Sequence, residues 1–284
     1  MEKTYEKQDR AFRFAFTAET GLRDGGEALR AEISAAGNMD CLIHGGNVLT
    51  GGNPKYLTMR ILEEEYGAYR DCAGKGLLLP VQGEMDGWRS ERYLGQIVWG
   101  IMTDEMWQEA TSFVDAYPDG SRPHGKPYYY VDFPEKRVRV IVLCSHFYEI
   151  DEELEMYEKY DGFDMAQRRW FAGEALNAPE GYTALIVSHT IPNSPFEKGS
   201  FRKGLLSMLS LMNQAKKAGL NIACWLTGAY GENRVEEMQI GMMTCVKMVS
   251  RDMRGGAAFD LCELDPDARM LTVRRGAESE TIGW

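Results

Sequence analysis

Short apolar runs alternate with longer amphipathic stretches through the first part of the chain. Residues 11–17 (AFRFAFT) alternate along the sequence as a half-buried strand does, and residues 40–44 (DCLIH) and 77–82 (LLLPVQ) predict two further strands. Residues 26–36 and 56–73 between them have the apolar spacing of helices. Strands that alternate with helices in this way are typical of βαβ units, so we expect a mainly parallel sheet here.

The pattern changes in the middle of the chain. Residues 91–117, rich in Trp, Met and acidic residues, predict helix and loop, whereas YYYVDF and VRVIVLCS around Pro134-Glu135-Lys136 predict an antiparallel hairpin. The rest of the chain predicts a helix at residues 165–177, a strand at 183–188, a helix at 201–219, a strand at 221–227 and a closing hairpin within 257–275 around Asp265-Pro266-Asp267.

Length and composition favour a globular protein. The 284 residues are 44% hydrophobic and 26% charged, enough for one large core, and we interpret residues 1–284 as a single domain. No apolar run approaches the roughly 18 residues of a membrane helix. The amino-terminal sequence MEKTYEKQDR is charged and unlike a signal peptide. We therefore expect a cytoplasmic protein that has no membrane partner.

Charge and cysteine spacing limit the classes of partner. The net charge of −11, with no dense Lys/Arg block, disfavours a binder of nucleic-acid duplexes and favours a small ligand, a protein partner or self-association. The cysteines form no Cys-x-x-Cys pair and do not combine with the four histidines at zinc-ligand spacing. We interpret them as reduced and buried. They are Cys41, Cys72, Cys144, Cys224, Cys245 and Cys262.

Four predicted strands end in a glycine or histidine turn. These turns are Gly45-Gly46, Gly83, His189 and Gly228. The carboxyl ends of strands in an α/β sheet gather along one edge, which is where ligands bind. Ordinary turn chemistry is the alternative for each turn alone, but the four together favour a ligand site.

In their order, these strand ends resemble the motifs of the calcineurin-like metallophosphoesterases, especially compact members found in phages and prophages. The family's Asp-x-His, Gly-Asp, Gly-Asn-His-Asp, lone His and Gly-His-x-His motifs correspond to Ala18-Glu19-Thr20, Gly46-Asn47, Gly83-Glu84-Met85-Asp86, Ser188-His189 and Gly228-Ala229-Tyr230-Gly231. The segments YYYVDFPEKRVRVIVL and FDLCELDPDARMLTVRRGAESETIGW extend the resemblance over nearly the whole chain. It implies a four-layer α/β/β/α sandwich with two mixed sheets.

The resemblance also implies that the family's chemistry is lost. That chemistry uses two cations about 3.5–4 Å apart to activate a hydroxide and hold the phosphoryl oxygens. At the family's ligand and catalytic positions stand Ala18, Thr20, Asn47, Glu84, Met85, Ala229 and Gly231, so that only His189 matches a ligand, with Asp86 also retained. We therefore expect an inactive homologue that has no catalytic residues and no metal or other cofactor.

The emptied site predicts binding instead of hydrolysis. Aromatic rings there could stack on a base, arginines could reach a phosphate, and polar groups could bond to ribose or base edges. Each residue also has an ordinary interpretation as a packed ring or a solvated ion pair. The candidate ligand-binding residues are Glu19, Thr20, Asn47, Glu84, Asp86, Trp88, Arg89, His146, His189, Tyr230, Glu232 and Asn233.

Three functions follow from these patterns. The first is a pseudoenzyme that binds a phosphate-containing, nucleotide-like small molecule and, if phage-encoded, sequesters a nucleotide signal in the host cytoplasm. The second is a structural or assembly protein with a vestigial pocket, in which Met-rich residues 206–212 and 238–253 contribute to a homo-oligomer interface. The third is a residual metal-dependent phosphodiesterase, with one ion held by Glu19, Glu84 and His189.

Overall fold

The computed structural model describes most of the chain at the level of secondary structure. The described residues are 10–20, 26–49, 55–93, 96–151, 156–190, 204–228, 236–240, 243–248 and 259–284.

One sheet has six strands in the order β17-β16-β15-β1-β2-β3. The three amino-terminal strands pair in parallel, as their connecting helices require, and the three carboxyl-terminal strands form an antiparallel meander on the free edge of β1. The strands are β1 Phe12–Thr17, β2 Cys41–His44, β3 Leu77–Pro80, β15 Asp260–Asp265, β16 Met270–Arg275 and β17 Glu278–Gly283.

The second sheet has seven strands in the order β13-β14-β12-β11-β8-β7-β6. Its four central strands are parallel, and antiparallel strands lie at both edges. The strands are β6 Gly120–Ser121, β7 Tyr129–Phe133, β8 Val138–Leu143, β11 Thr183–Ser188, β12 Asn221–Thr227, β13 Glu236–Ile240 and β14 Met243–Lys247.

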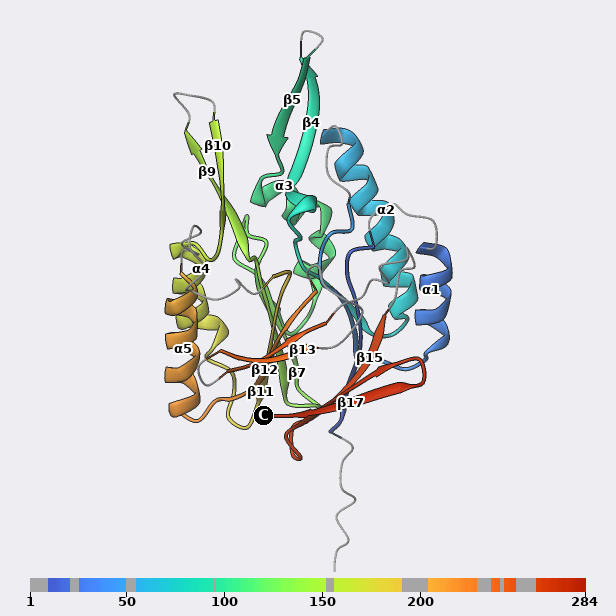
Figure 1. Cartoon of the computed structure of the whole chain (residues 1–284), viewed down its shortest axis with the longest axis vertical. Coiled ribbons are helices and arrows are strands. Elements are labelled where there is room, and N and C mark those ends of the chain that lie inside the picture. Colours follow the sequence, from blue (N-terminus) through green and yellow to red (C-terminus); the bar gives the residue numbers. More distant parts are fainter. Residues whose placement is uncertain are drawn as a thin grey trace, which may run out of the picture.

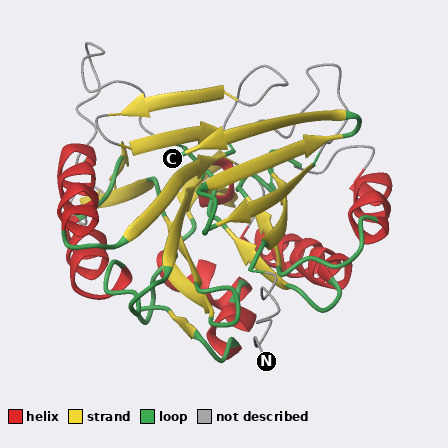
Figure 2. Cartoon of the chain, turned by 90° about the horizontal axis from the view of Figure 1, so that it is seen from below, coloured by secondary structure: helices red, strands yellow, loops and turns green. Residues whose placement is uncertain are grey.

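Helices cover the outer face of each sheet, which gives the four layers that the resemblance implies (Figures 1 and 2). One layer contains α1 Gly26–Ala35, α2 Lys55–Ala73, α3 Asp104–Ala110 and the 3₁₀ turn η2 Ser112–Ala116. The other contains α4 Met165–Trp170, its π-helical continuation η3 Phe171–Ala175, and α5 Leu205–Lys217.

The alternation of residues in β1 shows how the layers follow from the sequence. Phe12, Phe14 and Phe16 pack in the core between the two sheets, whereas Ala15 packs under the helices. Every residue of the central strand β8 is buried because both of its faces are covered. Strand β15, between β16 and β1, instead alternates between buried and half-buried positions.

The predicted strands, helices and hairpins are confirmed within the described residues, with one correction. Residues 91–117 are not all helix and loop, because β4 Trp88–Tyr93 and β5 Gln96–Ile101 form a hairpin before α3 begins. The acidic and polar residues of this segment suggest a solvated helix. The aromatic and β-branched residues at its cross-strand positions favour a ribbon, and that preference determines the structure.

Two further hairpins and a last strand are absent from the sequence prediction. These are the ribbon of β9 His146–Asp151 with β10 Met156–Asp161, the pair β13 and β14, and strand β17. The ribbon β9–β10 lies outside the two sheets, and β13 and β17 are edge strands, so their residues carry little of the apolar periodicity from which a strand is predicted.

The ribbons β4–β5 and β9–β10 rise from the same end of the molecule (Figure 1). Each is closed at its base by a backbone hydrogen bond, from Met102 N–H to the Gly87 carbonyl at 2.7 Å and from Gly162 N–H to the Ser145 carbonyl at 2.8 Å. One ribbon follows β3 of the first sheet and the other follows β8 of the second. Both therefore extend from the edge at which the strands end.

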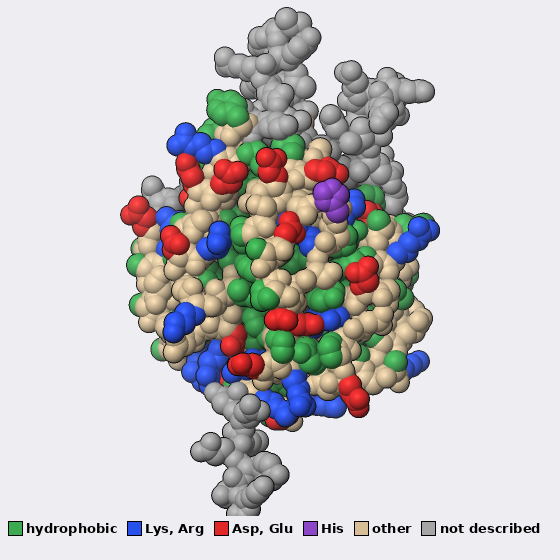
Figure 3. Space-filling view, turned by 180° about the vertical axis from the view of Figure 1, so that it is seen from behind, with side chains coloured by type: hydrophobic (Ala, Val, Ile, Leu, Met, Phe, Trp, Pro, Cys, Tyr) green, Lys and Arg blue, Asp and Glu red, His purple; other side chains and the backbone are tan. Residues whose placement is uncertain are grey.

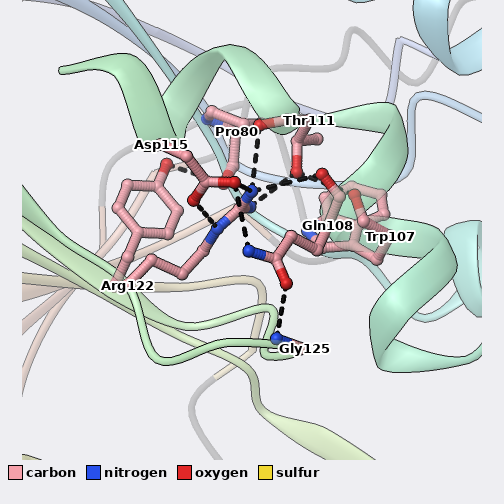
Figure 4. Close-up of polar contacts among 8 residues, drawn as sticks. Pro80, Trp107, Gln108, Thr111, Asp115, Arg122 and Gly125 are labelled. Atoms are coloured by element: carbon pink, nitrogen blue, oxygen red, sulfur yellow. Dashed lines mark hydrogen bonds and ion pairs between the residues drawn. The ribbon is translucent and has the colours of Figure 1, made fainter.

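A buried arginine fixes the segment between α3 and β7 (Figure 4). The Arg122 side chain, 1% exposed, donates from Nε and Nη2 to the two carboxylate oxygens of Asp115 at 2.7 and 2.8 Å. It also donates to Thr111 Oγ1 at 2.8 Å and to the Gln108 carbonyl at 3.2 Å. The Gln108 side chain in turn accepts the N–H of Gly125. This network holds the entry to the second sheet against the helices of the first.

On the face in Figure 3, acidic and basic side chains are interspersed around small apolar areas. None of the helices in the described ranges is both long and apolar enough to cross a membrane.

Candidate functional site

The strand ends of the two sheets meet at one edge, as the sequence predicts. A β-carbon placed on Gly46, after β2, would lie 2.8 Å from Gly83 Cα, after β3. His189, after β11, has its Nδ1 2.7 Å from the carbonyl oxygen of Gly45. Because a carbonyl only accepts, Nδ1 is the donor in this bond. Strand ends from both sheets are therefore joined at this edge.

One side of this edge is apolar and tightly packed. A β-carbon on Gly228 would lie 2.6 Å from the methyl of Ala18 and 3.1 Å from Phe16 Cζ. A β-carbon on Gly45 would lie 2.6 Å from the same Phe16 atom. Both glycines are needed because these close approaches leave no room for a side chain. The methyl of Ala18 thus fills a crevice between two glycine turns.

The other side is polar, and Asn47 is at its centre. The Asn47 amide donates from Nδ2 to Glu19 Oε1 at 2.8 Å, and its Oδ1 accepts the backbone N–H of Met85 at 2.8 Å. The residue is 2% exposed and has a φ of 57°, a left-handed conformation that Asn tolerates better than most residues. Both ends of its amide are therefore bonded within the protein.

Glu19 is the acidic residue that connects the two sheets. Its Oε1 lies 3.4 Å from Nε2 of His189 as well as accepting from Asn47, and its side chain is only 7% exposed. Its backbone has a φ of 56° and donates its N–H to the Gly46 carbonyl at 2.9 Å. A left-handed conformation costs a glutamate roughly 1–2 kcal/mol, and such conformations concentrate at functional sites.

Asp86 organises the loops beneath these residues. It is fully buried and accepts the backbone N–H groups of Asn47, Gly83 and Leu49 at 2.8, 2.9 and 2.9 Å. Burial raises the pKa of Asp86 to about 7, and the bonds from backbone N–H groups act in the opposite direction. Asp86 is therefore a structural anchor for two loops, with no access to solvent.

His44 is a member of this cluster that sequence reasoning missed. Its Nδ1 accepts the N–H of Gly46 at 3.3 Å, which leaves Nε2 to donate to Thr20 Oγ1 at 2.9 Å. Burial, and next the nearby His189, lower the pKa of His44 to about 3, so the ring is neutral. The sequence feature that could have identified His44 is its position as the last residue of β2, directly before Gly45-Gly46.

The structure brings half of the predicted residues together at this edge. The gathered residues are Glu19, Thr20, Asn47, Glu84, Asp86 and His189, of which Glu84 is half-buried between Gly83 and Met85.

The remaining predicted residues belong to the ribbons or to undescribed segments. His146 is buried at the start of β9, while Trp88 and Arg89 begin β4, where the structure describes the backbone but not the side chains. Tyr230, Glu232 and Asn233 lie outside the described residues. A ligand-binding role remains a prediction for the whole set.

The described residues at this edge do not fit a two-cation centre. Ala18 presents a methyl group, and the Asn47 amide is bonded at both ends inside the protein. Across the described ranges, no group of three or more His, Cys, Asp or Glu side chains is arranged to hold a metal ion.

Comparison with known proteins supports the fold. No protein-family model and no curated protein sequence matches the chain. Among solved structures, it is similar to a dimetal phosphatase from Danio rerio, with a TM-score of 0.61 and 11% identity over 96% of this chain and 99% of that chain. A protein from Thermus thermophilus gives a TM-score of 0.50 and 16% identity over 93% and 99% of the two chains. The chain has a calcineurin-like metallophosphoesterase fold.

Proposed function

We propose that this protein is a non-hydrolytic member of the fold, which binds a phosphate-containing, nucleotide-derived small molecule at the strand-end edge. The main support for this proposal is the hydrogen bonding of Asn47, whose amide bonds to Glu19 and Met85. The resemblance gives this position to a carboxylate that bridges two cations. An amide bonded at both ends within the protein cannot replace that anionic bridge.

Two features support binding at this edge. Carboxyl ends of strands in α/β sheets are the usual place for ligands, and Glu19 and Asn47 both have left-handed backbones there. The ribbon β4–β5 begins with Trp88 directly after the Asp86 turn, and β9 begins with His146 beside the end of β8. Rings and arginines at such positions suit the base and phosphate of a nucleotide.

Hydrolysis is tested first. Purified protein is assayed with a chromogenic phosphodiester in the presence of Mn²⁺, and its metal content is measured by mass spectrometry. We expect no turnover above the buffer rate and less than one equivalent of bound transition metal. Metal-dependent turnover that is lost in His189→Ala would establish a residual phosphodiesterase and refute the proposal.

Binding is tested separately. Native mass spectrometry of the purified protein, and analysis of small molecules released on heating, should reveal a nucleotide-derived ligand. A thermal-shift panel of mononucleotides, dinucleotides and cyclic nucleotides then ranks the chemical classes, because a ligand that binds only the folded state raises its stability. If no member binds and a large homo-oligomer interface is found, an assembly role replaces this proposal.

A further inference from the structure

We propose that Asn47 Nδ2 and His189 Nε2 form a subsite for an oxyanion, and that the carboxylate of Glu19 occupies it in the free protein. The ligand's anionic group would then enter by displacing this internal carboxylate. The inference deepens the proposed function and rests on it for the biological ligand. Its test uses orthophosphate alone, so the two can fail independently.

The geometry places two nitrogens around one oxygen. Glu19 Oε1 lies 2.8 Å from Asn47 Nδ2 and 3.4 Å from His189 Nε2. The Asn47 nitrogen comes from the loop after β2 of one sheet, and the His189 nitrogen from the end of β11 of the other. An oxygen held between strand ends of both sheets lies where a ligand arriving at this edge would place an anionic oxygen.

Both nitrogens are held in position before any ligand arrives. The Asn47 amide is oriented by the bond from Met85 N–H to its Oδ1, and the His189 ring by its bond to the Gly45 carbonyl. That second bond takes the hydrogen on Nδ1, so the Nε2 contact with a carboxylate is an ion pair when the ring carries both hydrogens. Donors that do not reorganise on binding are the basis of a selective anion site.

Glu19 has the chemistry of an occupant that can be replaced. A carboxylate and a phosphate both accept hydrogen bonds through anionic oxygens, so either suits the same donors. The Glu19 backbone is held in a left-handed conformation, with φ 56°, which favours glycine over glutamate. This strain belongs to the backbone, so it is relieved by a residue that has no β-carbon.

The test removes the internal carboxylate together with the rest of the Glu19 side chain. Glu19→Gly removes the occupant and relieves the left-handed backbone, and orthophosphate binding is followed by calorimetry and ³¹P NMR. We expect the variant to bind orthophosphate at least about ten-fold more tightly than the wild type, which corresponds to about 1.4 kcal/mol. Equal affinity in the two proteins, or no binding to a folded Glu19→Gly variant, would overturn the inference.

Two controls separate an emptied subsite from a simple change of charge. Glu19→Gln removes the same charge but keeps a side chain of the same shape, so it should gain less than two-fold in affinity. Glu63→Gln removes one exposed negative charge from helix α2 and should leave the affinity unchanged. A ten-fold gain in either control would show that charge alone is responsible.

A double variant tests whether the Asn47 amide binds the anion. Asn47 has a φ of 57°, so Asn47→Gly suits the backbone while removing the amide. Added to Glu19→Gly, it should abolish the gain in orthophosphate affinity. Circular dichroism melting of each variant establishes that it is folded, and a gain that persists without the amide would place the anion elsewhere.

Discussion

Among single residues, volume controls how closely the strand ends approach. Gly228→Ala should destabilise the protein by about 1–3 kcal/mol, because the new methyl would meet Ala18 Cβ at 2.6 Å and Phe16 Cζ at 3.1 Å. Adding Ala18→Gly should recover part of the loss, which a double-mutant cycle in urea measures. Gly67→Ala is the control, since nothing lies within 4 Å of its new β-carbon in helix α2, and it should stabilise by about 0.5–1 kcal/mol. Additive effects of the first two changes would contradict the packing described here.

A buried histidine should contribute acid sensitivity to the fold, opposite in sign to the contribution of Asp86, whose raised pKa favours the folded state as the pH falls below 7. The folded-state pKa of His44, about 3, lies below its ordinary value of 6.5, so the unfolded chain binds a proton that the folded one does not. Its stabilising contribution is complete above pH 6.5 and falls as the pH decreases towards 3, by about 1.4 kcal/mol per pH unit. In His44→Gln this part of the pH dependence should vanish, as measured by the free energy of unfolding in urea between pH 7 and 4. An unchanged slope would mean that other groups determine the acid response.

Sequence reasoning located much of the candidate site and missed how it is held together. The order of the glycine and histidine turns was enough to place Glu19, Asn47 and His189 near one another, because strand ends of an α/β sheet meet at one edge. The bond between Glu19 and Asn47 depends on two left-handed backbones, which no residue pattern encodes. His44 was missed for a related reason: a histidine that ends an apolar strand looks the same in sequence whether it packs or bonds.

At the scale of elements, the sequence predicts the strands that are buried in the core and misses the ribbons that lie outside it. Strands such as β8 and β11 are buried along their whole length and stand out as apolar runs. Within the described part of the chain, the ribbons β4–β5 and β9–β10 are separate two-stranded sheets, so cross-strand preferences determine them. Apolar and polar residues do not alternate regularly in these ribbons, so the sequence pattern did not predict their strands.

The Arg122 network provides a test of how one element is attached to the next. Arg122→Met should destabilise the protein by about 3 kcal/mol, the lower end of the range for a broken buried pair, because Asp115 retains access to water. Arg60→Met is the matched control: it breaks the exposed pair with Glu64 and should change stability little. Equal effects in urea unfolding would mean that burial of the guanidinium contributes nothing.

At the scale of the whole molecule, the two sheets are joined at the strand-end edge by bonds between protein groups, such as the one from His189 to the Gly45 carbonyl. We therefore expect the midpoint of thermal unfolding to be the same with excess EDTA and with added Mn²⁺. A cation that bound the folded state at 100 times its Kd would add about 2.7 kcal/mol, which a thermal melt resolves readily. A midpoint that rises with Mn²⁺ and falls with EDTA would show that the fold contains a cation site after all.

The position of β1 inside its sheet has a consequence for how the protein is made. This strand pairs on one side with β2 and on the other with β15, where Phe12 is opposite Leu264. Residues 18–259 are synthesised between β1 and β15. Until β15 has been synthesised, β1 therefore has an open, apolar edge of the kind that pairs with other chains. Both edges of β1 are paired only when residues 260–265 have emerged, so the synthesis of β15 is the step that protects β1 from aggregation.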